Sequence, residues 1–251
     1  LCAYADSYRA ERGWNYVEMR SASALLDFGS RFDRAMIYHL HRLDLRASLD
    51  ALRKGFHYDC IQRKIQRAER ESLSYESGRS SRLIRQLYGL LQMTRFRHHL
   101  PPQPIEWFHQ LMANMGKDAC IRIASKEGRP IAGILTLDHR HTTFYKYGGS
   151  DERFHNLGGI PLLLWKTIQE SKENAAEVLD LGRCDLDNPG LIAFKERWSA
   201  LSSALATWRA PLMVTSPIAE RRKLLLTRKV CAHLPDAVLK LAGRLLYRHI
   251  G

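Results

Sequence analysis

The spacing of the hydrophobic residues along the chain predicts alternating helices and strands. Apolar positions recur every three to four residues in the segments that we expect to be helical: 1–13, 45–56, 58–71, 80–91, 105–115, 160–168 and 191–198. Shorter apolar or alternating runs predict strands at 16–19, 36–43, 73–76, 119–124, 131–137, 142–147, 177–181 and 203–208. Turn-forming residues separate the three strands between 119 and 147, which predicts a meander.

Two polar clusters lie about one helix apart in the stretch from Tyr145 to Trp198. The first is 145–151, and the second runs over 180–185 and continues to 194–198. Each cluster follows a predicted strand, and a predicted helix lies between them. Such a strand–loop–helix–strand–loop unit brings both loops near the carboxyl ends of neighbouring strands, where open α/β sheets bind ligands. This stretch is therefore the candidate site.

The chain is strongly basic. Its 251 residues are 45% hydrophobic and 26% charged, which is ordinary for a globular protein. The formal net charge of +13 and the pI near 9.8 are not ordinary. Such an excess favours an anionic partner: a nucleic acid, a phosphorylated small molecule or an acidic membrane surface. A basic surface without a dedicated partner is the alternative.

The cysteines and histidines form no pattern typical of a disulfide framework or a metal site. The five cysteines are scattered and include no Cys-x-x-Cys pair, which favours a reducing, cytoplasmic compartment. His98, His99, His139 and His141 lack ligand spacing with a carboxylate partner, so no metal is expected. No apolar run approaches the roughly 20 residues needed to span a bilayer, and no signal peptide opens the chain. Because the chain begins at Leu1 rather than Met, we expect an N-terminal portion to be missing.

Residues 211–251 form a separate basic tail. Eight Lys and Arg residues against Glu220 and Asp236 give it a net charge of about +6. Helical spacing relates the apolar residues Val238, Leu241, Ala242 and Leu245, and the basic residues Lys240, Arg244 and Arg248 flank them. Basic amphipathic helices can lie on anionic membranes, although packing against the protein's own domain is the commoner alternative.

Three motifs in the candidate stretch resemble those of a known family. They are Tyr-Lys-Tyr-Gly-Gly-Ser-Asp (145–151), Asp-Leu-Gly-Arg (180–183) and Phe-Lys-Glu-Arg-Trp (194–198). Taken in this order and with the surrounding elements, they resemble the second GNAT-like domain of FemAB-type proteins. These include the bacterial aminoacyltransferases and related acyltransferases found beside exopolysaccharide and exosortase systems. The basic run at 63–71 is similar to the helix that links the two domains in that family.

The resemblance implies an α/β (α+β) fold of the GNAT type, in which helices flank a mixed, mostly antiparallel sheet. Two GNAT-like halves are usual in the family, so the chain should hold one complete domain and part of a second. We expect a partial N-terminal domain with the basic linker helix at 1–75 and a complete acyltransferase domain at 76–212. The basic helical tail would occupy 213–251.

The resemblance also implies an activity. The chain would move an acyl or aminoacyl group from acyl-CoA, or alternatively aminoacyl-tRNA, to an amine of a cell-envelope, peptidoglycan or polysaccharide precursor. The expected partners are a phosphorylated or nucleotide-linked substrate, tRNA, and an anionic membrane contacted by the tail. The expected location is cytoplasmic, with peripheral contact at the inner membrane face. Charge alone supports a different class, a non-catalytic module that binds nucleic acid or anionic lipid.

Tyr145 and Tyr147 are the candidate proton donors. In a regular strand both face one side and Lys146 faces the other. A tyrosine hydroxyl on the site face could donate to a carbonyl oxygen or return a proton to a leaving group, and an ordinary aromatic strand surface is the alternative. The following Gly148 and Gly149 would let backbone amides approach a ligand closely.

Asp151 and Lys195 complete the predicted transfer site. Asp151 could orient an acceptor amine or cap the turn that it begins. The resemblance implies that Lys195, in the Phe-Lys motif, stabilises the oxyanion that develops on the attacked carbonyl. The alternative is a surface lysine beside two core residues, Phe194 and Trp198.

The loop from Arg153 to Gly159 leads into a helix with Pro161 in its first turn, a favoured place for proline. We expect Arg153, Gly158 and Gly159 to bind an anion, because free N–H groups and the helix dipole face a ligand at a helix amino end. The resemblance places the coenzyme A pyrophosphate here, usually on Arg/Gln-x-x-Gly-x-Gly/Ala. His155 stands first in that spacing and Ile160 last, so the match is degenerate and leaves aminoacyl-tRNA open as the donor.

The helix predicted at 58–71 carries a positive stripe. Arg63, Arg67 and Arg70 lie at positions i, i+4 and i+7, and we expect only Glu69 and Glu71 to offset them. The stripe predicts contact with phosphate, from a nucleotide-linked precursor, coenzyme A or tRNA. A solvated helix face is the alternative.

Arg183 follows a predicted strand end and could clamp a phosphate or carboxylate. It could equally pair with Asp180 or Asp185 as part of the structure. Its neighbour Cys184 has no histidine predicted beside it. We therefore expect a structural thiol rather than a nucleophile.

Overall fold

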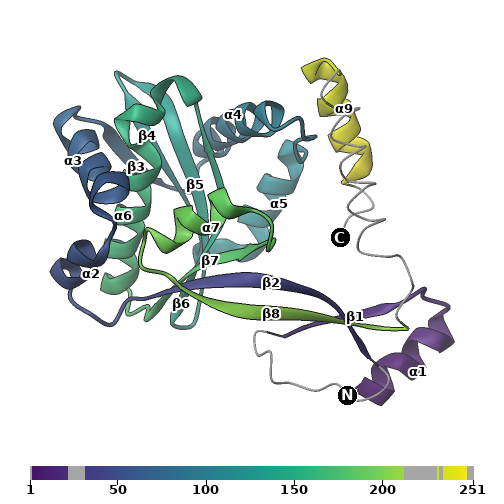
Figure 1. Cartoon of the computed structure of the whole chain (residues 1–251). Coiled ribbons are helices and arrows are strands. Elements are labelled where there is room, and N and C mark those ends of the chain that lie inside the picture. The colour runs from purple at the N-terminus through teal and green to yellow at the C-terminus, as the bar shows by residue number, and fades with distance from the viewer. Residues whose placement is uncertain (1, 22–31, 212–230, 232–233, 248–251) are drawn as a thin grey trace.

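Eight strands form one mixed sheet in the computed structural model, which describes residues 2–21, 32–211, 231 and 234–247 (Figure 1). The strand order is β1-β8-β2-β7-β6-β5-β4-β3. The strands are β1 (Val17–Ser21), β2 (Asp33–Asp44), β3 (Ser74–Gly78), β4 (Ala119–Lys126), β5 (Arg129–His139), β6 (Thr142–Ser150), β7 (Val178–Cys184) and β8 (Leu201–Ala210). All neighbours pair antiparallel except β6 and β7, which are parallel.

Helices lie on both faces of this sheet (Figure 1). They are α1 (Cys2–Arg12), α2 (Leu49–Gly55), α3 (Arg63–Arg70), α4 (Ser81–Arg97), α5 (Ile105–Met115), α6 (Gly159–Glu173), α7 (Pro189–Glu196) and α9 (Asp236–Leu246). Short helical turns complete the set: a π turn at Tyr58–Gln62 and 3₁₀ turns at Gly116–Asp118 (η2) and Glu152–Leu157 (η3). The single helix expected over 58–71 therefore begins as a π turn before it becomes α3.

Local sequence explains where the helices on the two faces begin. Ser80 precedes α4, and its side chain accepts a hydrogen bond from the Leu83 N–H at 3.2 Å. This satisfies one of the backbone donors that every helix start leaves free. Ser48 does the same for α2, whereas Pro104, which has no side chain that could accept such a bond, precedes α5.

The sheet separates two hydrophobic cores. On one face, α2, α3 and α6 bury residues such as Ile65, Leu163 and Trp198. On the other face, α4 and α5 bury residues such as Leu87 and Phe108. The aromatic ring of Phe56 meets those of Trp165 and Trp198 edge-on at 5.9 and 5.0 Å, so the connection before α3 is fixed to the first core.

The predicted fold class, a mixed and mostly antiparallel sheet flanked by helices, is confirmed. The division into 1–75, 76–212 and 213–251 stays a prediction. The sheet itself is continuous across residue 75, since β2 lies between β7 and β8. Most of the tail, residues 212–230, 232–233 and 248–251, lies outside the described residues.

Candidate functional site

Strands β6 and β7 run side by side and then separate. Residues 142–144 of β6 pair with 178–180 of β7. Beyond them, β6 continues to pair with β5 alone and β7 with β2 alone. The ladder therefore opens toward the carboxyl ends of two parallel strands, where ligands bind in open α/β sheets. The candidate stretch of the sequence surrounds this opening.

The start of α6 is held tightly by its neighbours. Gly158 has φ = 76°, a left-handed conformation that favours glycine. A Cβ on Gly158 would lie 2.2 Å from the carbonyl oxygen of Lys64, and one on Gly159 would lie 2.7 Å from the Cβ of Ala132. Because the two glycines have no side chain, the backbone at the helix start can contact α3 and β5 directly. A helix start leaves N–H groups without partners inside the helix, so this position stays a candidate for the predicted anion site.

A pocket of about 270 Å³ lies at this helix start. Its lining comes from four separate stretches of the chain and includes Lys64, Ser150, His155, Gly159, Ile160, Phe194 and Arg197. Lys64 and Arg197 make no ion pair with any acidic side chain in the described part of the chain. The pocket therefore combines two uncompensated cations with the positive end of a helix, which suits a bound anion.

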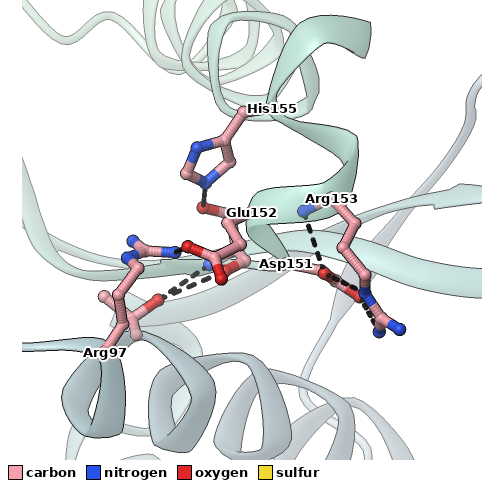
Figure 2. A network of polar contacts seen from close by, with 7 residues as sticks. Arg97, Asp151, Glu152, Arg153 and His155 are labelled. Atoms are coloured by element: carbon pink, nitrogen blue, oxygen red, sulfur yellow. Dashed lines mark hydrogen bonds and ion pairs between the residues drawn. The ribbon is translucent and has the colours of Figure 1, made fainter.

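A polar network fixes the loop that precedes the pocket (Figure 2). The Asp151 carboxylate accepts hydrogen bonds from Arg153 at 2.6 and 2.9 Å and from Arg129 at 3.2 Å, and it also caps η3. Hydrogen bonding to Arg153 lowers the pKa of this carboxyl group. The capping role considered for Asp151 is confirmed, and Arg153 is held by Asp151. In this structure both side chains therefore serve to hold the loop in place.

His155 lies at the pocket end of the same network (Figure 2). Its Nε2 is 2.8 Å from the hydroxyl of Ser150. Burial lowers the pKa of His155, and the nearby cation Arg97 acts in the same direction. The imidazole in the first position of the degenerate pyrophosphate motif is thus predominantly neutral near pH 7, and it can offer a hydrogen bond but not the fixed charge of an arginine.

A second, more open hollow of about 730 Å³ adjoins the pocket and shares Lys64 and His155 with it. The hollow is lined by Arg63, Arg67 and Arg70. The positive stripe therefore lies next to the pocket at the start of α6. The expectation that only Glu69 and Glu71 offset the stripe is wrong. The carboxylate of Asp59 pairs with Arg63 at 2.9 Å.

The remaining pairs of this helix leave part of its charge available. Arg67 contacts Glu71 at 3.8 Å, while Glu69 pairs with Arg53 at 3.4 Å, away from the stripe. Arg70 pairs with no acidic side chain among the described residues. Exposed ion pairs are worth little, so a phosphate could displace them.

Lys195 is buried, with 2% of its surface exposed, so the alternative of a surface lysine is wrong. It lies near the end of α7, which begins at the Asn188 cap. Its Nζ donates to the carbonyl oxygens of Gly182 and Arg183 at 2.7 and 3.0 Å. These carbonyls end β7 at the opening of the ladder. Burial lowers the pKa of Lys195, and its role toward an oxyanion stays a proposal.

Tyr145 and Tyr147 face opposite sides of the sheet, which corrects the expectation that they share one face. A β-bulge lies at Lys146, because Leu135 pairs with Tyr147 whereas Thr136 pairs with Tyr145. The extra residue reverses the alternation of side chains. Tyr145 packs with the core under α6, and Tyr147 packs with the core under α4 and α5.

The surroundings of the two hydroxyl groups differ accordingly. The Tyr147 hydroxyl accepts a hydrogen bond from Trp107 Nε1 at 3.0 Å. The Tyr145 hydroxyl extends over Gly148, where a Cβ would lie only 1.9 Å away. Burial raises the pKa of Tyr145 to about 12. Tyr145 therefore lies on the face that bears the pocket, and Tyr147 does not.

Gly148 and Gly149 are required by packing. Gly148 leaves room for the Tyr145 ring, and a Cβ on Gly149 would lie 2.6 Å from the backbone of Leu90 in α4. The expectation that both glycines let backbone amides approach a ligand is therefore not needed to explain them. Strand β6 lies against a helix at this point.

Arg183 is exposed and makes no ion pair with Asp180 or Asp185, so the structural pairing considered for it is wrong. Its guanidinium lies 4.3 Å from the centre of the Tyr38 ring. The carboxylate of Asp180 instead accepts from Arg42 at 3.0 Å and from the Gly182 N–H at 2.7 Å. Arg183 remains available to a ligand.

Cys184 has a histidine beside it, which corrects the sequence expectation. The Nδ1 of His41 is 3.6 Å from the Cys184 sulfur, and both residues are buried. His41 lies at an irregularity in the pairing of β2 with β7. Burial raises the pKa of the Cys184 thiol and lowers that of His41. The pair thus favours its neutral form, which is not that of an activated nucleophile.

Sequence reasoning missed Lys64, Ser150 and Arg197 as lining residues. Lys64 is one of several basic residues in its helix, and Arg197 is adjacent to a core tryptophan. The sequence pattern therefore did not distinguish either residue from its neighbours. A signal was available for Arg197, which lies two residues after Lys195 in a motif already identified. Among the described residues, no group of three His, Cys, Asp or Glu side chains could hold a metal ion.

The fold and the site define a class of protein. The family model of the acetyltransferase (GNAT) domain matches residues 56–196, more than half of the chain. The chain therefore belongs to the GNAT acetyltransferase family. No curated protein sequence matches it significantly.

Solved structures give the same fold. The C-terminal domain of a proposed lysylphosphatidylglycerol synthetase from Agrobacterium fabrum matches with a TM-score of 0.62 at 14% identity, covering 89% of this chain and 77% of that one. FemX matches at 0.58 and 12%, covering 88% and 70%. L-PGS from Bacillus licheniformis matches at 0.53 and 12%, covering 89% and 69%. The resemblance to FemAB-type and GNAT proteins is thus confirmed, and at these identities the neighbours show the fold alone.

Proposed function

We propose that the chain transfers an acyl group from acyl-CoA to an amine of a cell-envelope, peptidoglycan or polysaccharide precursor. The observation that carries this proposal is the pocket at the start of α6, which the first-turn residues Gly159 and Ile160 line together with Lys64 and Arg197. An acyl-CoA carries a pyrophosphate, and phosphates bind at helix amino ends beside cations. The adjoining stripe of α3 would hold the remaining phosphate of the donor.

The transfer would proceed by direct attack of the amine on the thioester carbonyl. The N–C bond forms, the C–S bond breaks, and a proton from the amine finally joins the leaving thiolate. Lys195 would stabilise the charge on the carbonyl oxygen, for which it has one ammonium proton beyond its two backbone bonds. Tyr145 would donate its own proton to the leaving thiolate and recover one from the attacking amine, because a phenol with a pKa of about 12 is protonated at neutral pH.

The acceptor would be phosphorylated or nucleotide-linked. Arg183 supports this part of the proposal, because its exposed guanidinium lies over the Tyr38 ring and pairs with no acid in the described residues. A planar fork held in this way suits a phosphate or carboxylate. The carbonyl oxygen of Arg183 also accepts a hydrogen bond from Lys195. An acceptor bound at the Arg183 side chain would therefore lie near the transfer chemistry.

A second donor, aminoacyl-tRNA, is favoured by one observation. The hollow lined by Arg63, Arg67 and Arg70 is larger and more open than the pocket, as a polyanion would require. FemX and the lysylphosphatidylglycerol synthetases share the fold. Mass spectrometry of the purified chain, incubated separately with acyl-CoA mixtures and with charged tRNA, distinguishes the donors. Thiol release supports the first donor, and deacylation supports the second.

A non-catalytic module that binds nucleic acid or anionic lipid remains the alternative from a different class. Its affinity would fall steeply with salt and depend on the α3 stripe or the tail. If neither donor is consumed while such salt-dependent binding occurs, this alternative replaces the acyltransferase.

A further inference from the structure

Helix α9 is docked on the domain by one face only. Leu239 is buried, with 1% of its surface exposed. A Cβ on Gly243 would lie 2.0 Å from the carbonyl oxygen of Pro102, so the helix backbone rests directly on the segment between α4 and α5. The hydroxyl of Tyr247 accepts a hydrogen bond from Arg95 at 2.6 Å. Residues at four-residue spacing share a helix face, and these three define the inner one.

The outer face of α9 is apolar. Val238, Leu241 and Leu245 lie at positions i, i+3 and i+7, opposite the inner face, and are 43%, 57% and 56% exposed. In Figure 1, α9 stands at the edge of the molecule beside α4 and α5. An outer helix face is normally polar. The helix therefore packs on the protein's own domain, as one of the two alternatives held, but it does so through the inner face and leaves Val238, Leu241 and Leu245 of the stripe exposed.

Charge identifies the kind of surface that would cover this stripe. Lys240 and Arg244 are exposed beside it, one turn apart, and neither pairs with an acidic side chain among the described residues. Asp236, at the opposite end, is the only acid of the helix. A second copy of this chain would meet the stripe with a net charge of +13 of its own. An apolar stripe flanked by cations matches the boundary between lipid head groups and acyl chains.

We propose that the outer face of α9 docks on an anionic lipid bilayer, with Val238, Leu241 and Leu245 inserted and Lys240 and Arg244 on the head groups. No helix among the described residues is long and apolar enough to cross a membrane, so the contact lies in the plane of the interface. The inner face keeps the domain attached to the helix. This surface is separate from the pocket and does not depend on the acyl-transfer proposal.

Co-sedimentation of the full chain with vesicles tests the proposal. Vesicles of phosphatidylcholine are compared with vesicles that also contain phosphatidylglycerol. The wild type should bind the anionic vesicles, and the variant Leu241→Glu/Leu245→Glu should lose at least roughly tenfold in partitioning. Leu201→Glu is the matched control, because Leu201 is 75% exposed on β8, and it should bind like the wild type.

The charges are tested separately. Lys240→Ala/Arg244→Ala should lower partitioning onto anionic vesicles roughly fivefold per charge and leave any binding to neutral vesicles unchanged. All variants should keep the wild-type melting temperature and the wild-type transfer activity in solution, which distinguishes this proposal from that of acyl transfer.

Three results would overturn the proposal. The first is equal binding of the wild type and the Leu241→Glu/Leu245→Glu variant, and the second is no binding of the wild type to anionic vesicles. The third is a wild-type dimer in sedimentation velocity that the same variant converts to a monomer without any vesicle binding. In that case a second copy of the chain covers the stripe.

Discussion

The two faces of the sheet differ at the carboxyl end of β6. On the face under α6, Tyr145 packs with the core, and Ser150 lines the pocket that holds the uncompensated cations Lys64 and Arg197. On the face under α4 and α5, Tyr147 is partly buried against Phe108, whose ring meets that of Tyr147 edge-on at 5.1 Å. One bulge residue, Lys146, sends the two tyrosines to these different faces. Two residues of the same type, two positions apart, can therefore have unrelated tasks.

The largest effect expected on the pocket face comes from Lys195. Lys195→Met should lower the transfer rate roughly 10²- to 10³-fold, because a preorganised donor to the oxyanion is lost. Steady-state kinetics measures this loss. The affinity for the donor should stay within about twofold of wild type, since the phosphates bind elsewhere. Lys117→Met, at an exposed position of η2, serves as the control, and full activity of Lys195→Met would remove the residue from the chemistry.

The tyrosines sharpen the comparison directly. Tyr145→Phe should lower the rate roughly 10²-fold through loss of a general acid. Tyr147→Phe should leave the rate unchanged and affect only the hydrogen bond from Trp107. Transfer rates of both variants, measured at saturating substrate, show which tyrosine takes part in the reaction. The opposite order of effects would mean that the face under α4 and α5 carries the chemistry.

The cations of the pocket should act on binding. Lys64→Ala and Arg197→Ala should each raise the KM for the donor roughly tenfold and leave kcat nearly unchanged, as expected for the loss of one charged hydrogen bond. Arg85→Ala, at an exposed position of α4 on the other face, is the matched control. A fall in kcat without a change in KM would contradict a binding role.

Glycine variants test why the start of α6 has its shape. Gly159→Ala should destabilise the protein by about 1–3 kcal/mol, because its methyl group overlaps Ala132. Gly89→Ala, within α4 and with nothing within 4 Å of the added Cβ, should stabilise it by about 0.5–1 kcal/mol. Urea denaturation measures both. Equal stability of the two variants would show that the contact with β5 is not tight.

The smallest effect concerns pH. Asp151 has a folded-state pKa below its ordinary value of 3.8, so its stabilisation is complete above that value and is lost as pH falls through the lowered folded-state pKa. Asp151→Asn should cost about 1 kcal/mol at pH 7, because it removes the negative charge that accepts hydrogen bonds from Arg153 and Arg129. The difference between the two proteins should shrink in acid. Unfolding curves recorded at pH 7 and below pH 4 provide the check.

Periodicity predicted most of the fold, because regular elements follow from side-chain spacing alone. The helix Ile105–Met115 was placed at its observed ends, and the meander was found with its strands somewhat short. The order of strands in the sheet did not follow from spacing. The position of β2 between β7 and β8 depends on contacts between residues more than 130 positions apart.

The site was predicted less completely, for physical reasons. Helix chemistry predicted an anion site at the helix start of Gly158 and Gly159, and in the structure Gly159 lines a pocket together with Lys64 and Arg197. The bulge at Lys146 left no mark in the alternation of side chains, so the two tyrosines were placed on one face. The charge of Arg63 was overestimated because its partner, Asp59, precedes the expected basic run.

The central claim is that the pocket at the start of α6 receives the phosphates of the donor. Isothermal titration of coenzyme A into the wild type and into Lys64→Ala/Arg197→Ala tests it most directly. The account predicts binding by the wild type and roughly 100-fold weaker binding by the double variant, as for two charged hydrogen bonds lost. Arg85→Ala should bind like the wild type. Equal affinities of the wild type and the double variant, or no binding of coenzyme A by the wild type, would contradict the account.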